Sequence, residues 1–203
     1  MEKQVTIDSD GLQLYGLLHR GTTDCGVLIT HPHPLYGGDM FNPVVETVAD
    51  AYRKCGHTTL RFNFRGVGKS QGSFDDGNGE RRDVSASLAR LKEIGVTHID
   101  LAGYSFGAWV NALPGDGAGL IRHIIMISPP VAFIEFSPEI VLPALKLVVT
   151  GSRDEIAPEP LVRKNLLTWN SAARFELIEG ADHFYFGYLE ALESILVDHL
   201  NCI

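Results

Sequence analysis

The stretch "IDLAGYSFGAWV", residues 99–110, places one serine between two glycines. Gly103, Ser105 and Gly107 have the G-x-S-x-G spacing, with an apolar run typical of a strand before them and helical spacing after them. A sharp strand-to-helix turn strains its central residue, and the strain is tolerable only where the neighbours lack side chains. The pattern therefore predicts Ser105 as a nucleophile and the Phe106 amide, at a helix N-terminus, as an oxyanion donor. The alternative is a serine that only caps the following helix.

A serine hydroxyl needs a base, and His183 is the best placed of the eight histidines. It lies in "IEGADHFYFG", just past the final predicted strand, where the histidine belongs in the chain order Ser, Asp, His. His199 follows in the terminal helical pattern, where we expect a surface position. The histidines in or beside other predicted strands are His19, His57, His98 and His123. The alternative for His183 is an exposed loop residue that caps a helix.

The acid that orients the histidine is expected in a loop between Ser105 and His183. The segment "LKLVVTGSRDEIAP" ends a strand and presents Asp154, whose carboxylate can fix the imidazole tautomer and stabilise its charged form. Glu155 is adjacent but is expected to point elsewhere, and Asp182 is too close in sequence to His183 to orient that ring easily. The alternative is an Asp154 that only caps the next helix.

The loop "THPHPLYGGDM", residues 30–40, is predicted to supply the second oxyanion amide. Its two prolines have no N–H, which leaves His33 and Leu35 as donors, with Leu35 favoured. A metal site is the competing interpretation, because His31 and His33 in H-x-H spacing can face one ion. The chain has no second ligand cluster with convincing spacing, so hydrogen bonds from these histidines to the loop backbone are favoured over metal binding.

A second glycine-rich stretch, "RGVGKSQGS", resembles the end of a phosphate-binding P-loop. The full pattern requires a glycine where this chain has Asn63, and it requires a helix directly after Lys69 and Ser70. The residues that follow are "QGSFDDGNG", which predict a loop. We therefore expect a turn that shapes one wall of a cleft, with Arg65 as a structural hydrogen-bond donor.

Short apolar runs alternate with longer segments of helical period along the chain. The predicted strands are 4–8, 12–20, 26–32, 58–64, 98–104, 121–128, 144–151 and 174–180, and helices are expected at 43–54, 80–93, 159–168 and 187–200. The first two strands are expected to pair antiparallel at an edge. Val84, Leu88 and Leu91 lie on one face of the second predicted helix. This alternation predicts βαβ units and a mostly parallel sheet, whose functional groups lie at the carboxyl ends of the strands.

The composition limits the classes of function. The 203 residues fit one domain, 1–203, and the apolar share of 45% and charged share of 21% are typical of a folded chain. A net charge of −8 without a Lys/Arg-rich run argues against a nucleic-acid partner. The sequence predicts no signal-peptide core and no membrane span. Three cysteines, Cys25, Cys55 and Cys202, are an odd number without CxxC spacing, which favours reduced thiols in the cytoplasm.

With these motifs assembled, the chain resembles the α/β-hydrolase superfamily over nearly its whole length. More narrowly, "HPHPLYGGDM", "FNFRGVGKS" and "GYSFG" resemble motifs of small bacterial hydrolases related to dienelactone hydrolase. The resemblance implies a central sheet of about seven or eight strands, a Ser105–His183–Asp154 triad and ester hydrolysis through an acyl-enzyme. We expect no cofactor. Dienelactone hydrolase itself uses a cysteine nucleophile, so its substrate does not carry over to a chain with Ser105.

We therefore expect a serine hydrolase, with carboxylesterase activity on small acyl esters favoured. A thioesterase or a small peptidase would use the same triad, and a hydrolase fold that only binds ligands is the alternative from another class. The segment between "ISPP" and "LPALKL" is too short for a large helical lid, so an open cleft is expected. Nothing in the sequence favours a particular oligomeric state.

Overall fold

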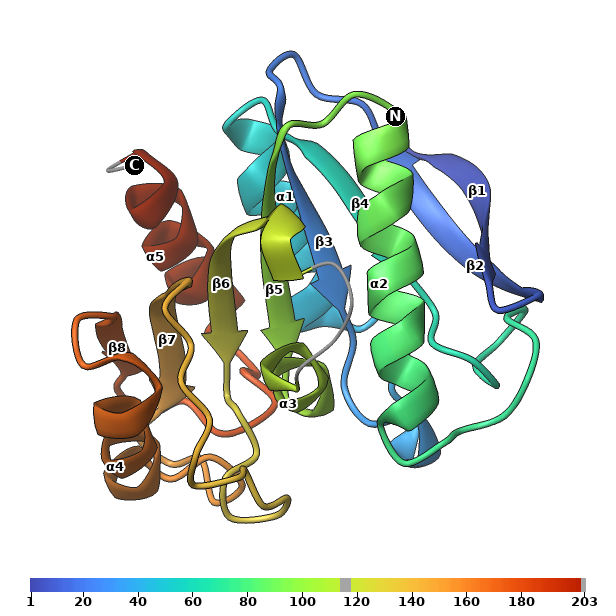
Figure 1. The fold of residues 1–203 in the computed structure, drawn as a ribbon. Helices are drawn as coiled ribbons and strands as arrows, with labels where there is room; N and C mark the ends of the chain where they lie inside the picture. Colours follow the sequence, from blue (N-terminus) through green and yellow to red (C-terminus); the bar gives the residue numbers. More distant parts are fainter. Residues whose placement is uncertain (114–117, 202–203) are drawn as a thin grey trace.

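The computed structural model describes residues 1–113 and 118–201, and Cys202 lies outside them. Eight strands form one sheet in the order β1-β2-β4-β3-β5-β6-β7-β8 (Figure 1). The strands are β1 (Lys3–Ser9), β2 (Leu12–His19), β3 (Cys25–Thr30), β4 (Thr58–Phe62), β5 (His98–Tyr104), β6 (Ile121–Ile127), β7 (Leu145–Gly151) and β8 (Arg174–Ile178). The strands from β4 to β8 are parallel, and β2 is antiparallel to both β1 and β4. The expected antiparallel edge and mostly parallel sheet are confirmed.

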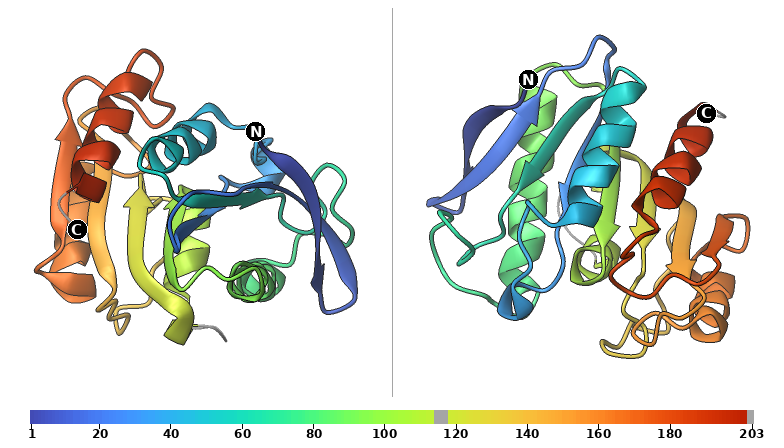
Figure 2. Two further views of the ribbon diagram at one scale, coloured as in Figure 1. Left: turned by 90° about the horizontal axis from the view of Figure 1, so that it is seen from above. Right: turned by 180° about the vertical axis from the view of Figure 1, so that it is seen from behind.

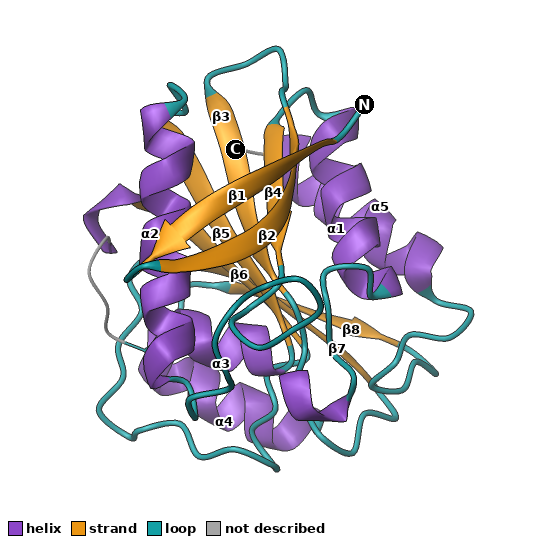
Figure 3. Ribbon diagram, turned by 90° about the vertical axis from the view of Figure 1, so that its right-hand side faces the viewer, coloured by secondary structure: helices purple, strands orange, loops and turns teal. Residues whose placement is uncertain are grey.

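Helices cover both faces of this sheet (Figure 2). The helices α1 (Pro43–Lys54) and α5 (Leu189–Asn201) pack together over one face. The opposite face is covered by α2 (Asn78–Glu93), α3 (Phe106–Ala112) and α4 (Glu159–Asn170). The central strands β3 and β5 are buried on both sides, which explains their continuous apolar sequence. Figure 3 shows β1 and β2 crossing in front of the other strands, as the twist of the sheet requires.

Local sequence signals set the ends of the helices. Pro43 begins α1 after Asn42, whose side chain accepts the Val44 N–H, and the helix has the predicted bounds. The helix α2 begins at Asn78, earlier than the predicted residue 80. The buried Glu80 carboxylate explains this early start, because it accepts the N–H groups of Asp75 and Gly77 at 3.0 and 2.8 Å.

The expected surface position of His199 is wrong. This side chain is only 6% exposed. Leu192, Leu196, His199 and Leu200 form one buried stripe of α5, which packs against α1 and the sheet. The helical period therefore places His199 on the covered face, although its polarity suggested the solvent face.

The connection between β6 and β7 contains no helix. Residues 128–144 form only turns, bends and segments without regular secondary structure. This agrees with the expected absence of a helical lid over the carboxyl ends of the parallel strands.

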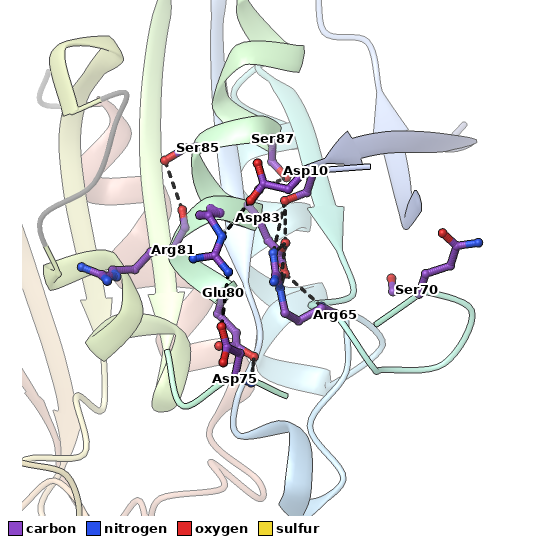
Figure 4. Close-up of polar contacts among 12 residues, drawn as sticks. Asp10, Arg65, Ser70, Asp75, Glu80, Arg81, Asp83, Ser85 and Ser87 are labelled. Carbon is purple, nitrogen blue, oxygen red and sulfur yellow. Dashed lines mark hydrogen bonds and ion pairs between the residues drawn. The ribbon is translucent and has the colours of Figure 1, made fainter. Parts of the chain in front are cut away.

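A buried ion pair fixes the loop that follows β4 (Figure 4). Arg65 donates from Nη2 to Asp83 Oδ1 at 2.7 Å, and the Arg65 N–H donates to Asp83 Oδ2 at 3.0 Å. Ser9 of β1 donates to the same carboxylate at 2.7 Å. Asp83 is fully buried and Arg65 is 6% exposed. Arg65 is thus the structural donor predicted from the sequence, and the loop around Lys69 leads into further loop, not into a helix.

We predict that Asp83→Asn destabilises the protein by about 3–5 kcal/mol, because the substitution leaves a buried guanidinium without its counter-charge. Urea unfolding followed by circular dichroism measures the change. Glu93→Gln is the matched control, since it removes the partner of Arg90 in an exposed ion pair and should cost under about 1 kcal/mol. Equal effects of the two substitutions would contradict the prediction.

Candidate active site

Ser105 lies in the turn between β5 and α3 with a strained backbone. Its φ is 54° and its ψ is −120°, a conformation that residues with side chains rarely adopt. A Cβ on Gly103 would lie 2.6 Å from the Ala108 nitrogen, and one on Gly107 would lie 2.6 Å from the Thr30 carbonyl oxygen. Both glycines are therefore required by close packing around the turn. The expected sharp strand-to-helix turn is present.

Three predicted side chains meet at this turn. Ser105 Oγ lies 3.0 Å from His183 Nε2, and His183 Nδ1 lies 2.9 Å from Asp154 Oδ2. Their exposed fractions are 7% for Ser105, 6% for His183 and 4% for Asp154. Because a carboxylate only accepts hydrogen bonds, Nδ1 carries the proton of the neutral ring, and Nε2 is free to accept the serine proton. The geometry is that of a hydroxyl coupled to a base and an acid.

Asp154 is held by its own loop. Its Oδ1 accepts the N–H groups of Ile156 at 2.9 Å and Ala157 at 2.7 Å. Burial raises the pKa of this carboxyl, but the hydrogen bond and charge of His183, with further hydrogen bonds from Ser128 and Ala157, lower it to a net value below 3.8. Asp154 is therefore ionised at neutral pH, and its carboxylate can accept the hydrogen bond from His183 Nδ1.

The loops that carry the acid and the histidine are tied to each other. The Arg153 N–H donates to the Ala181 carbonyl at 2.9 Å, and the Gly180 N–H donates to Ser152 Oγ at 2.8 Å. A Cβ on Gly151 would lie 2.2 Å from the Ala181 oxygen, so glycine allows the end of β7 to approach this loop. The two loops are far apart in sequence, but these contacts hold Asp154 and His183 in a fixed relative position.

Other residues that support the site were not predicted from the sequence. Tyr104 Oη donates to the His183 carbonyl oxygen at 2.7 Å. Ser128 Oγ and Tyr185 Oη lie 2.8 Å apart in the buried space behind Asp154, and both residues have a positive φ. Only Tyr104 had a sequence signal, its place directly before Ser105.

The remaining candidate acids lie outside this hydrogen-bonded chain. Asp182 Oδ1 accepts the Phe184 N–H at 3.0 Å, and Glu155 is exposed. The pocket in front of Ser105 has a volume of about 350 Å³. It is lined by Pro32, His33, Tyr36, Gly37, Gly38, Asn42, Tyr104, Ser105, Phe106, Pro130, Phe133, Ile134, Ile156, His183 and Phe184. A larger pocket of about 650 Å³ between α2, α3 and residues 137–144 contains none of the three groups.

The two predicted loop donors differ in their surroundings. The Leu35 N–H donates to His33 Nδ1 at 3.2 Å, and Leu35 is not among the pocket-lining residues. His33 lines the pocket, and no acceptor for its N–H lies within the described part of the chain. The Phe106 N–H is at the first position of α3, where no intrahelical acceptor is available. Within the described residues, the amides of His33 and Phe106 thus have no protein acceptor, whereas the Leu35 amide is occupied.

The H-x-H pair does not form a metal site in this structure. His31 Nδ1 donates to the Pro32 carbonyl at 2.7 Å, and His31 Nε2 accepts the Phe64 N–H at 3.0 Å. Burial lowers the pKa of His31 to about 4, so the ring is neutral at neutral pH. Both ring nitrogens of His31 are engaged in hydrogen bonds to the loop backbone, the arrangement that the sequence favoured over metal binding. Among the described residues, the ligand atoms of Asp24, Cys25 and His98 come within 4.8 Å of one another, at the opposite end of the sheet from Ser105.

Comparison with known proteins identifies relatives over most of the chain. No family model matches the sequence. An uncharacterized protein of Rickettsia prowazekii is 36% identical over 186 residues, which covers 87% of this chain and 78% of that protein. The solved structure of an α/β serine hydrolase homologue from Coxiella burnetii is 36% identical with a TM-score of 0.87 and covers 98% of this chain and 97% of its own. An α/β serine hydrolase without a lid from Xanthomonas campestris is 32% identical with a TM-score of 0.90, covering 99% and 94%.

The similarity to these proteins agrees with the sheet order and with the turn at Ser105. Together they define a hydrolase fold, in which the site lies at the carboxyl ends of the parallel strands. The chain belongs to the α/β-hydrolase family. Its solved relatives support a hydrolase, and the lidless architecture of the Xanthomonas protein matches the connection between β6 and β7 in this chain.

We predict that Gly107→Ala destabilises the protein by about 2–3 kcal/mol, because its Cβ would collide with the backbone of Thr30. Urea unfolding measures the change. Gly119→Ala is the control, since no atom of the described residues lies within 4 Å of the position of its Cβ, and it should change stability by under about 1 kcal/mol. A fully stable Gly107→Ala protein would contradict the close packing described for this turn.

The lowered pKa of Asp154 predicts a specific loss of stability in acid. The folded pKa lies below the unfolded value of 3.8, so the unfolded chain takes up this proton first as the pH falls. The stabilisation is complete above about pH 5 and is lost as the pH falls through about 4 toward the folded pKa. Urea unfolding between about pH 7 and pH 3 should show a steeper loss for the wild type than for Asp154→Asn. The exposed Asp198→Asn is the control and should follow the wild type.

Proposed function

We propose that this hydrolase is a serine carboxylesterase that cleaves small acyl esters through Ser105, His183 and Asp154. The observation that carries the proposal is the continuous hydrogen-bond chain from Ser105 Oγ to His183 Nε2, at 3.0 Å, and from His183 Nδ1 to Asp154, at 2.9 Å. The chain opens onto a pocket of small-molecule size.

In the proposed mechanism, Ser105 Oγ attacks the ester carbonyl carbon while His183 Nε2 accepts the hydroxyl proton. The oxyanion forms beside the Phe106 amide, at the N-terminus of α3. Asp154 holds the Nδ1–H and stabilises the imidazolium. His183 then gives its proton to the leaving alkoxide, and an acyl-enzyme remains. A water molecule, deprotonated by His183, then attacks the acyl carbon, the bond from this carbon to Ser105 Oγ breaks, and His183 returns the proton to Oγ as the acid leaves.

We assign the second oxyanion donor to the amide of His33. Leu35 was favoured from the sequence, but its N–H already donates to the His33 ring. This hydrogen bond makes Nδ1 of His33 an acceptor, and it supports the loop from which the His33 amide is presented. The tight packing of the Gly38 backbone against Pro32 and His33 holds the same loop close to the pocket.

We further propose membership of the small dienelactone-hydrolase-like group, with a serine in place of the cysteine nucleophile, as a single domain spanning residues 1–203. The free thiols of Cys25 and Cys55 support a reducing compartment such as the cytoplasm. No helix in residues 1–113 and 118–201 is long and apolar enough to span a membrane. The proposed substrate is a small molecule, and the proposed chemistry requires no cofactor, metal or nucleic acid.

A fluorophosphonate probe and p-nitrophenyl acetate test the proposal. We predict that the wild type is labelled and that Ser105→Ala abolishes labelling and lowers kcat by about 10³-fold or more. Asp154→Asn should lower kcat by about 10³–10⁴-fold, because the histidine loses the partner that fixes its tautomer.

Ser73→Ala is the matched control, since Ser73 is exposed and should leave labelling and turnover unchanged. A folded wild type that resists the probe would refute the serine-hydrolase proposal and favour a binding role for the fold. Labelling with turnover of thioesters but not of esters would reassign the substrate class.

A further inference from the structure

The entrance of the Ser105 pocket is bordered by exposed aromatic side chains. Tyr36 is 74% exposed, Phe133 is 62% exposed and Phe184 is 57% exposed, and all three line the pocket. They come from three separate segments, after β3, after β6 and after β8. Phe186 is also exposed, and its ring centroid lies 5.9 Å from that of Phe184. We call these four residues the aromatic rim.

The rim is built from contacts between these segments. The ring centroids of Tyr36 and Phe133 lie 6.0 Å apart in an edge-to-face arrangement, across the two loops that flank the pocket. Phe184 packs edge-to-face against the His183 ring, with centroids 5.7 Å apart. Large apolar side chains gathered around one opening are typical of a binding surface, whereas single exposed ones need no explanation.

Charge is absent from the same pocket. Its lining, which consists entirely of described residues, contains no Lys, Arg, Asp or Glu. His33 supplies no cation at neutral pH, because burial lowers its pKa from 6.5. An acyl group with a carboxylate would therefore lose water without gaining a counter-charge, which disfavours its binding in this pocket.

We propose that the substrates of this site carry an uncharged, apolar acyl group that extends from Ser105 onto the aromatic rim. The inference rests on the proposed esterase function and specifies its acyl specificity. The volume of about 350 Å³ is at the lower end of ligand pockets but leaves room for an acyl chain longer than acetate, and Tyr36 and Phe133 line the pocket where such a chain would lie. Specificity arises from apolar burial and from exclusion of charge.

A series of p-nitrophenyl esters tests the chain-length part. We expect kcat/KM to rise at least about tenfold from acetate to hexanoate, since each buried methylene contributes about 0.8 kcal/mol at most. The predicted exclusion of charged acyl groups is tested by comparing the monoglutarate ester with the neutral pentanoate ester. We expect the monoglutarate to be at least about tenfold poorer.

Two rim variants test the assignment of the contacts. Phe133→Ala and Tyr36→Ala should each lower the ratio of kcat/KM for the hexanoate to kcat/KM for the acetate by about fivefold or more, mainly through KM for the hexanoate. Leu167→Ala is the matched control, because Leu167 is equally exposed at 74% but lies outside the pocket lining.

The outcomes separate this inference from the function on which it rests. Loss of fluorophosphonate labelling in the folded wild type would refute the esterase itself. Normal labelling with a flat chain-length profile, or with the monoglutarate as the better substrate, would overturn only the acyl specificity. A dimer in sedimentation that Phe133→Ala dissociates, with no change in chain-length preference, would also overturn it and make the rim an interface between two copies.

Discussion

The backbone of Ser105, held at φ 54° and ψ −120°, is the constraint around which the rest of the site is arranged. Such a conformation costs about 1–3 kcal/mol, and it persists only where the surroundings determine it. Here the Ser105 N–H donates to the Ile127 carbonyl at 2.9 Å, while Gly107 packs on the end of β3. The strain is thus offset by the two strands on either side of β5. The same turn directs the hydroxyl and the Phe106 amide toward one space.

The parallel sheet then brings the other groups to that space. The strands β5 and β7 end at the same edge, so Asp154 needs only a short loop to face the segment after β8. Hydrogen bonds between residues 151–153 and 178–181 remove the freedom that two separate loops would have. Tyr104 adds a bond from the end of β5 itself to the His183 carbonyl. The histidine is therefore positioned by three strands of one rigid sheet.

Much of this arrangement is predictable from the sequence because it depends on local patterns. Strand-helix alternation predicts the parallel sheet, and the order of Ser105, Asp154 and His183 at successive strand ends predicts their meeting. Which amide of the loop after β3 lacks an acceptor was not predictable from the sequence, because the answer depends on whether the Leu35 N–H donates to the His33 ring. The Ser128–Tyr185 contact depends on tertiary packing, which no local pattern in the sequence shows. The burial of His199 follows the helical period of α5, but the polarity of this side chain suggested the solvent face.

The short connection between β6 and β7 supplies residues both behind the site and at the pocket in front of it. Without a helical cover, residues around Phe133 border the pocket directly, and the exposed rings take the place that a lid would occupy. Ser105, His183 and Asp154 nevertheless remain more than nine-tenths buried, and Tyr104 packs against the His183 ring from the end of β5. The fold itself therefore shields the acid and the base from water on most sides. Only on the side that faces the pocket would a bound substrate have to displace water. Under the proposed function, an apolar acyl group resting on those rings would cover this face during the attack of Ser105, and departure of the alcohol would reopen it to the water that hydrolyses the acyl-enzyme.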